Sequence, residues 1–288
     1  AEHHGMANIA SAVPELLIAH TADVTTRIRV GAGGVMLPNH VPLRVVEQYR
    51  TLHALYPGRI DLGIGRAAGT DPLNARALRT VSGDQFGQQL GELLAFAEGG
   101  FAPEHPYASI SVTPDGVPLP PIWMLGSSGG SARLAGDLGL GYAYAGHFSP
   151  SPAAPAIARY RDSFQPSRAF AEPHVILALT VICAPTHELA TELSSTMAMV
   201  FFDLARGRRR PALSPQEARA AGWEPELLEH LGPMARLMII GDPEGARAQI
   251  MERADAIGAD EVMVMCVTHD PEARLSCYRL LADAFALP

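Results

Sequence analysis

Short apolar runs alternate along the chain with segments whose apolar residues recur every three or four positions. Ile60, Leu62 and Ile64 form one such run, with their side chains on the face opposite to Asp61 and Gly63, as in a half-buried strand. Strands alternating with amphipathic helices are typical of a parallel α/β fold. The predicted strands span residues 28–33, 60–64, 122–125, 141–145, 175–183 and 261–267.

Two helix starts near the C-terminal end of the chain are marked by the same residue types. The sequences Asp242-Pro243-Glu244 and Asp270-Pro271-Glu272 each combine an N-cap carboxylate, a proline in the first turn and an acid near the positive end of the helix dipole. We therefore expect a helix to begin directly after Asp242 and another directly after Asp270.

The number of strands favours one architecture over another. Six strands are two fewer than a closed barrel needs, and the chain opens at Ala1-Glu2-His3-His4 as if at the end of a strand. We predict a (β/α)8 TIM barrel that lacks its first strand, its first helix and most of a second strand. The missing part would be roughly 40 residues long. An open doubly wound sheet needs no missing piece, but no dinucleotide-binding motif lies where that fold requires it. The prediction is one barrel domain over residues 1–288, with an insertion at about 206–234.

Composition and charge exclude several classes of protein. The 288 residues are 48% hydrophobic, which is enough to form one large core. A net charge of −8 disfavours binding to nucleic acid. No apolar stretch reaches the roughly 20 residues of a membrane span, and no signal segment opens the chain, so we expect a cytoplasmic protein. The three cysteines, an odd number without metal-ligand spacing, are interpreted as buried thiols: Cys183, Cys266 and Cys277.

Two glycine-rich segments end predicted strands. Gly31-Ala32-Gly33-Gly34 suits either a tight turn or a flat ring lying on the backbone. Arg66 follows a Gly-Ile-Gly strand end, where a barrel places its active-site residues. Its guanidinium suits a phosphate or a carboxylate, or else an ion pair at the barrel rim.

A third segment combines a strand, small hydroxyl-bearing residues and a helix. Ser127-Ser128-Gly129-Gly130-Ser131 follows the strand at 122–125 and precedes a predicted helix over 132–138. Free N–H groups at the start of a helix favour an anion, so the segment predicts a phosphate site. The alternative is an ordinary flexible loop in which Ser131 caps the helix.

Histidines supply the candidate acid–base chemistry. His3-His4 can bind a metal, act as a general acid or base, or be structural. No second cluster with ligand spacing supports a metal, so we expect proton chemistry and no metal site. His147, after the strand at 141–145, faces the same pocket or lies at the rim.

Several segments in the same order resemble the bacterial-luciferase-like flavin-dependent monooxygenases, and the resemblance covers nearly the whole chain. They are Glu2-His3-His4 and the ranges 28–40, 56–66, 126–131 and 241–244. The resemblance implies a (β/α)8 barrel that binds FMN, or in one branch a deazaflavin coenzyme, at its C-terminal mouth.

The resemblance also implies a role for individual residues. His3 would be catalytic, assisting the reaction of the flavin with oxygen. Gly33 and Gly34 match the position of a non-proline cis peptide under the flavin ring. The flavin phosphate would be bound by Arg66 and by the loop residues Ser127, Ser128, Gly129 and Ser131.

These features predict a flavin-dependent oxidoreductase acting on a small organic substrate. The first hypothesis is a two-component FMN-dependent monooxygenase that receives reduced flavin from a separate flavin reductase. A deazaflavin-dependent dehydrogenase on the same barrel is the second, and a non-catalytic flavin-binding protein the third. The resemblance to this family also implies that the protein forms a homodimer. The departure from the family is the absence of a first strand and helix before Glu2-His3-His4.

Overall fold

The computed structural model describes residues 1–208, 210–230 and 232–287. The chain divides into two compact units, and each unit is assembled from three stretches. The first unit comprises Ala1–Leu125, Ala135–Tyr142 and Phe164–Pro173. The second comprises Gly126–Leu134, Ala143–Ser163 and His174–Pro288.

The strands of the first unit are arranged around β3 (Ile60–Gly65). Both β1 (Val30–Gly31) and β2 (Val35–Met36) pair with it in parallel on one side, and β4 (Ile122–Gly126) pairs in parallel on the other. In the register, Ile64 lies opposite Val35 and Met124. The apolar residues Ile60, Leu62 and Ile64 of β3 are buried, as its alternating sequence predicts.

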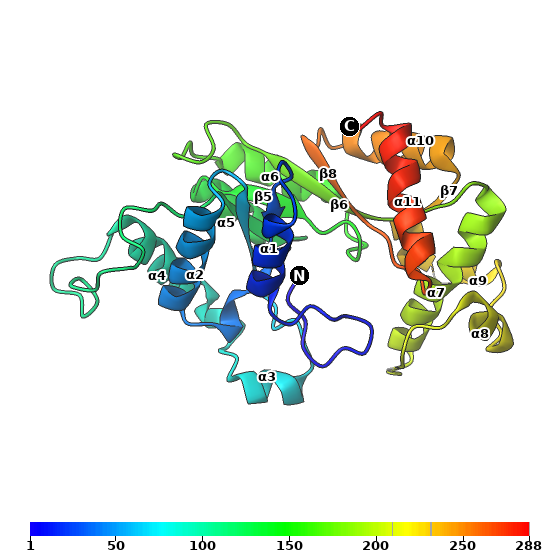
Figure 1. Cartoon of the computed structure of the whole chain (residues 1–288), viewed down its shortest axis with the longest axis horizontal. Helices are drawn as coiled ribbons and strands as arrows, with labels where there is room; N and C mark the ends of the chain where they lie inside the picture. Colours follow the sequence, from blue (N-terminus) through cyan, green and yellow to red (C-terminus); the bar gives the residue numbers. More distant parts are fainter. Residues whose placement is uncertain (209, 231, 288) are drawn as a thin grey trace. The chain divides into compact units, whose positions relative to one another are not determined.

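Helices cover this sheet and connect its strands (Figure 1). The helix α2 packs against both α4 and β3. Its buried stripe is formed by Val45, Tyr49 and Leu52, three or four residues apart. The bounds are α1 (Pro14–Asp23), η1 (Leu37–Asn39), α2 (Pro42–Leu55), α3 (Pro72–Leu78), η2 (Gly83–Gln85) and α4 (Phe86–Glu98).

The second unit has β6 (Val175–Cys183) as its central strand, with β7 (Met238–Gly241) on one side and β8 (Glu261–Met265) on the other, all parallel. Both α5 (Gly129–Asp137) and β5 (Gly141–Tyr144) contribute residues to both units. The other helices are α6 (Ala153–Ser163), α7 (His187–Ala205), α8 (Pro215–Ala220), α9 (Leu227–His230), η3 (Gly232–Leu237), α10 (Pro243–Asp255) and α11 (Pro271–Ala284).

The predicted helix caps are confirmed. The side chain of Asp242 accepts a hydrogen bond from the N–H of Gly245 at the start of α10, and that of Asp270 accepts from Glu272 and Ala273 at the start of α11. The helices α8, α9 and part of η3 fall in the predicted insertion at about 206–234. Two residues of that range, 209 and 231, lie outside the described residues.

Other predicted boundaries need correction. The strands β2 and β7 were not predicted, and the two residues of β2 are too few to show a period. The strand predicted at 28–33 is reduced to β1, and α5 begins at Gly129 rather than at residue 132. The α/β fold with parallel strands is observed, whereas the closed barrel and its missing first strand and helix stay predictions. Across the described residues, no helix has the length and apolarity needed to cross a membrane.

Candidate functional site

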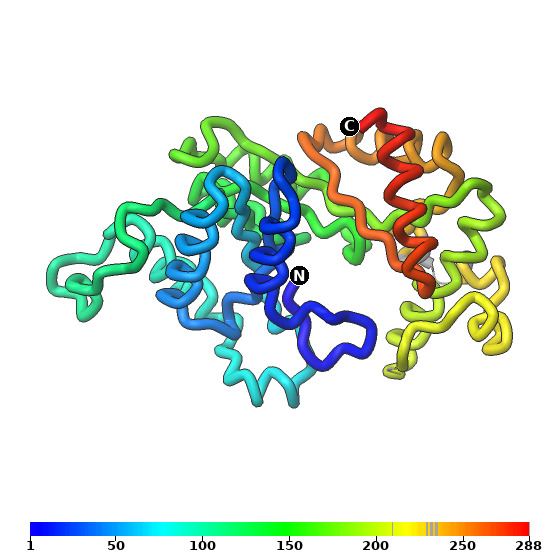
Figure 2. The backbone as a smooth tube through the Cα atoms, viewed as in Figure 1, coloured from blue at the N-terminus to red at the C-terminus, as the bar shows by residue number. Residues whose placement is uncertain are grey.

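The first residues of the chain are hydrogen-bonded to the segment that leads into β2. The N–H of Glu2 donates to the carbonyl oxygen of Gly34 at 3.0 Å, and the N–H of His3 donates to that of Ser11 at 2.8 Å. Figure 2 shows the chain between these first residues and α1 as a loop. The two bonds fix the backbone from which the side chains of Glu2 and His3 project.

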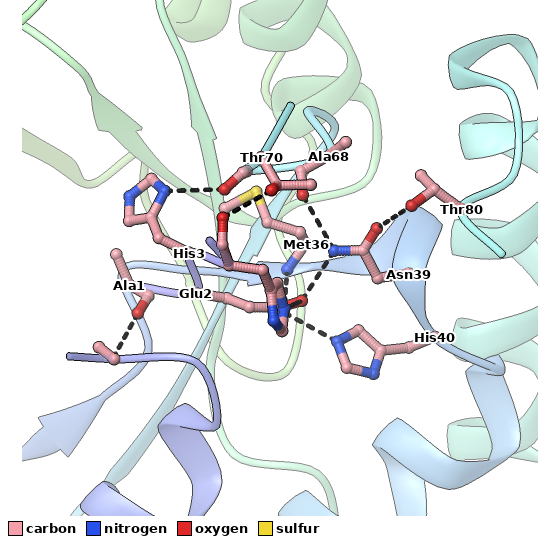
Figure 3. A network of polar contacts seen from close by, with 12 residues as sticks. Ala1, Glu2, His3, Met36, Asn39, His40, Ala68, Thr70 and Thr80 are labelled. Carbon is pink, nitrogen blue, oxygen red and sulfur yellow. Dashed lines mark hydrogen bonds and ion pairs between the residues drawn. The ribbon is translucent and has the colours of Figure 1, made fainter. Parts of the chain in front are cut away.

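The side chain of Glu2 is completely buried and accepts four hydrogen bonds (Figure 3). Its Oε2 accepts from the backbone N–H of Met36 and from Nε2 of His40, each at 2.8 Å. Its Oε1 accepts from Nδ2 of Asn39 at 2.8 Å and from Nε2 of His4 at 3.0 Å. We call these five residues the Glu2 network. Because a buried carboxylate without donors is strongly unfavourable, the four donors explain how the charge is accommodated.

Glu2 and His40 shift each other's ionisation in opposite directions. Burial alone would raise the pKa of Glu2, but the hydrogen bonds from its four donors outweigh burial and lower that pKa to about 2. Burial alone would lower the pKa of His40, but the hydrogen bond and the charge of Glu2 outweigh burial and raise it above its ordinary value. Between these two pKa values the residues form an ion pair.

Asn39 extends the Glu2 network to the loop that follows β3. Its Nδ2 donates a second hydrogen bond, to the carbonyl oxygen of Ala68 at 3.0 Å. The hydroxyl of Thr80 donates to Oδ1 of Asn39 at 2.6 Å, which fixes the orientation of the amide. From the same loop, the hydroxyl of Thr70 donates to the carbonyl oxygen of His4 at 2.6 Å. The loop at 66–70 is therefore attached to the start of the chain and to η1.

His3 has a defined tautomer in this arrangement. Its Nδ1 lies 3.2 Å from the carbonyl oxygen of Gly69. A carbonyl oxygen only accepts, so Nδ1 carries the proton and Nε2 of the neutral ring carries the lone pair. Within the described residues, Nε2 makes no hydrogen bond. Gly69 has φ +65, and a Cβ there would lie 2.6 Å from the carbonyl oxygen of Glu2, so this contact requires glycine.

Gly33 and Gly34 differ in what surrounds them. A Cβ on Gly34 would lie 2.8 Å from the carbonyl oxygen of Gly63, so the backbone passes β3 too closely for a side chain. A Cβ on Gly33 would have no atom within 4 Å, and this residue is exposed. The peptide bond between them is cis, at the position where the resemblance implied one.

Arg66 lies directly after β3, at its carboxyl end. Its side chain is exposed and, among the described residues, makes no ion pair and no hydrogen bond. A guanidinium in such a position has its donors available for an anion.

Ser128 and Ser131 are joined at the start of α5. The N–H of Ser131 donates to Oγ of Ser128 at 3.4 Å, and the hydroxyl of Ser131 donates to the carbonyl oxygen of Ser128 at 3.0 Å. The first contact is the one an N-cap side chain makes, so the cap is Ser128. The alternative interpretation, with Ser131 as the cap, is wrong, because α5 begins at Gly129.

The predicted site residues fall into two sets. His3, Gly33, Gly34 and Arg66 all belong to the first unit, where His3 contacts the loop that follows Arg66. The second set, Ser127, Ser128, Gly129 and Ser131, belongs to the second unit.

Sequence reasoning missed the Glu2 network. Glu2, Asn39 and His40 lie inside the segments that carry the family resemblance, but none of them was given a role. The only signal was a glutamate next to two histidines, and three of its four partners are 34 to 38 positions away along the chain. Among the described residues, no group of three or more His, Cys, Asp or Glu side chains could hold a metal ion.

The family model of luciferase-like monooxygenases matches residues 1–261. The chain belongs to this family. It is 42% identical over 289 residues to the uncharacterized protein YvbT of Bacillus subtilis, covering 99% of this chain and 84% of that protein. It is 37% identical over 286 residues to a luciferase-like monooxygenase of Escherichia coli K12, with coverage of 98% and 84%. It is 32% identical over 297 residues to the N-acetyl-S-alkylcysteine monooxygenase of B. subtilis, with coverage of 99% and 86%.

Solved structures show the same fold. Apo-MsnO8 is 38% identical with a TM-score of 0.89, covering 100% of this chain and 86% of that chain. The oxygenating constituent of 3,6-diketocamphane monooxygenase of Pseudomonas putida, in complex with FMN, is 19% identical with a TM-score of 0.68 and coverage of 98% and 86%. An F420-dependent secondary alcohol dehydrogenase has the same TM-score at 14% identity, with coverage of 98% and 88%. The last two similarities concern the fold alone.

Proposed function

We propose that this protein is an FMN-dependent monooxygenase that oxidises a small organic substrate with O2. A separate flavin reductase supplies the reduced FMN. The observation that carries the proposal is membership of the luciferase-like monooxygenase family over residues 1–261. In this proposal residues 1–288 form one barrel domain with an insertion at about 206–234, and two copies form a homodimer.

The first unit suits the ring and the phosphate of a flavin. A flat ring needs backbone without a projecting side chain, and the exposed Gly33 with open space in its Cβ direction provides it. Gly34 holds that backbone close to β3. The exposed guanidinium of Arg66 is free to bind a phosphate in its planar fork of donors.

The second unit supplies a further group of donors. Ser127, Ser128, Gly129 and Ser131 stand at or beside the first turn of α5, whose unpaired N–H groups and dipole favour an anion. We assign these residues to the flavin phosphate as well. The support is their position at a nine-residue helix after a strand end.

In this proposal the residues of the chain bind the flavin, orient the reacting groups and transfer protons. When bound, reduced FMN supplies the electron pair that activates O2. His3 would hold or deliver a proton at Nε2, because its Nδ1 proton is used by Gly69. The fixed backbone of Glu2 and His3 keeps that imidazole in one direction.

Flavin titrations test the proposal. We would titrate the protein with FMN and with riboflavin, oxidised and anaerobically reduced, and follow flavin fluorescence. FMN should bind, and Arg66→Ala should weaken FMN about tenfold or more while leaving riboflavin, which has no phosphate, nearly unchanged. Arg44→Ala, at an exposed arginine of α2, is the matched control.

Other outcomes distinguish the alternatives. If the protein binds a deazaflavin coenzyme and not FMN, the proposed function becomes that of a dehydrogenase that transfers hydride. Flavin binding without oxygen consumption, with a reductase present, would indicate a non-catalytic protein. N-acetyl-S-alkylcysteines are the first substrates to test, because a relative at 32% identity is named for them.

A further inference from the structure

Three backbone segments of the first unit carry residues of the proposed flavin site, and Glu2 is connected to all three, through its carboxylate or through its backbone (Figure 3). They are the start of the chain with His3, the segment that includes Gly33 and Gly34, and the loop at 66–70. We propose that Glu2 is a positioning residue, whose buried carboxylate clamps these segments in the arrangement that receives the flavin. This inference rests on the function proposed above.

The first connection is to the glycine segment. Glu2 holds it at two points, because its N–H donates to the carbonyl oxygen of Gly34 and its Oε2 accepts from the N–H of Met36. The two contacts come from the backbone and the side chain of one residue. A shift of this carboxylate would therefore move the backbone on which the flavin ring is proposed to lie.

The second connection is to the loop after Arg66. Oε1 of Glu2 accepts from Asn39, and the same Nδ2 donates to the carbonyl oxygen of Ala68. The side chain of Asn39 thus lies between the carboxylate and the loop, with Thr80 fixing its orientation. Glu2 acts on Arg66 through this amide and does not contact it.

The third connection is to His3. Gly69 accepts a hydrogen bond from Nδ1 of His3, and a Cβ on Gly69 would lie 2.6 Å from the carbonyl oxygen of Glu2. The backbone of Glu2 and the loop therefore determine together where the imidazole points. All three connections lie within the first unit.

Among the described residues, the carboxylate accepts hydrogen bonds from four donors, so the position requires a group that only accepts. Glutamine has nearly the same shape, but its NH2 would face two of the donors, which leaves polar groups unpaired. Aspartate keeps an acceptor-only group on a side chain shorter by one methylene. Glu2→Gln is therefore the disruptive variant, and Glu2→Asp is the conservative one.

Glu15 provides the matched control. It is also buried, with 8% of its surface exposed, and its charge acts on His40 as that of Glu2 does. Its Oε1 is buried and has no hydrogen-bond partner among the described residues. Glu15→Gln thus removes a buried charge near His40 without touching the clamp.

The experiment combines hydrogen exchange of the flavin-free protein with FMN titration, both well below the unfolding temperature. In Glu2→Gln we expect faster amide exchange at 33–36 and at 66–70, and FMN binding weakened about tenfold or more. Glu15→Gln should change neither, and Glu2→Asp should restore part of both. Asn39→Ala removes only the second connection. It should speed amide exchange at 66–70 and leave amide exchange at 33–36 unchanged.

The outcomes separate this inference from the proposed function. If Glu2→Gln folds, exchanges like the unmodified protein and binds FMN equally well, Glu2 is not a positioning residue. If Glu2→Gln does not fold, unchanged exchange at 66–70 in Asn39→Ala overturns the clamp. If the unmodified protein binds no FMN, the proposed function fails, and the exchange results still decide whether Glu2 holds the three segments.

Discussion

Nε2 of His40 lies 2.8 Å from Oε2 of Glu2, and the contact favours the charged form of both residues. Glu2 is fully buried, whereas 27% of the side chain of His40 is exposed. A buried carboxylate that loses a donor keeps its desolvation cost, so removing one partner is more damaging than the pair is stabilising. The pair therefore links the stability of the first unit to pH.

We predict that stability is greatest between about pH 4.5 and about pH 6.5, the ordinary values of the two groups. The lowered pKa of Glu2 gives a contribution that is present above 4.5 and is lost as the pH falls toward 2. The raised pKa of His40 gives a contribution that is present below 6.5 and is lost as the pH rises through the raised value. Thermal unfolding measured from below pH 4.5 to above pH 6.5 records both losses of stability, which we call the acid limb and the alkaline limb of the profile.

Two variants assign the limbs of that profile. His40→Gln keeps a donor for Glu2 but cannot titrate, so the alkaline limb should flatten while the acid limb remains. Glu2→Gln should flatten both, since the charge of Glu2 is what raises the pKa of His40. Glu15 also acts on His40, so Glu15→Gln should reduce the alkaline limb slightly. An alkaline limb unchanged in His40→Gln would show that another group produces it.

Part of the fold followed from the sequence because some elements are long and regular. β6 has the predicted bounds, since nine nearly continuous apolar residues leave little choice of structure. β2 has two residues, and it is defined only by its pairing with β3. A strand of that length carries no periodic signal, so its existence depends on tertiary contacts that the sequence does not display.

The same distinction applies to the candidate site. His3 and Arg66 could be predicted as site residues because their residue types follow recognisable motifs at strand ends. Glu2 was not assigned a role, because the importance of a carboxylate depends on what donates to it. Its donors at Met36 and His40 are 34 and 38 positions away, and only the folded backbone brings them together.

The two adjacent glycines should respond differently to alanine. Gly34→Ala places a Cβ 2.8 Å from the carbonyl oxygen of Gly63, and we expect a loss of roughly 1–3 kcal/mol in the free energy of unfolding. Gly33→Ala places it in open space, so stability should change by less than about 0.5 kcal/mol. Because the new methyl occupies the surface proposed for the flavin ring, FMN binding should nevertheless weaken. Denaturant unfolding and FMN titration of both variants measure these effects, and unchanged FMN binding in Gly33→Ala would place the ring elsewhere.

Tyr49 in α2 should tolerate loss of its hydroxyl. Its side chain is fully buried, and the hydroxyl has no hydrogen-bond partner among the described residues. Removing an unsatisfied buried group relieves its desolvation cost, so Tyr49→Phe should leave the free energy of unfolding unchanged or raise it by about 1 kcal/mol. Tyr160→Phe is the control, because that hydroxyl accepts from the N–H of His174 at 3.0 Å. It should destabilise by about 1 kcal/mol, and an equal loss in both variants would indicate a partner for Tyr49.

His3→Ala separates proton chemistry from flavin binding. The imidazole is attached to the loop by a single hydrogen bond to Gly69, so its removal should leave the fold and the FMN affinity nearly unchanged. If Nε2 holds or delivers a proton in the reaction, turnover should fall by about 10²- to 10⁴-fold. Single-turnover assays with reduced FMN, monitoring oxygen uptake and product, measure the loss independently of the reductase. A folded His3→Ala protein that no longer binds FMN would instead make His3 a cofactor-binding residue, and the proton would have to be handled by another group.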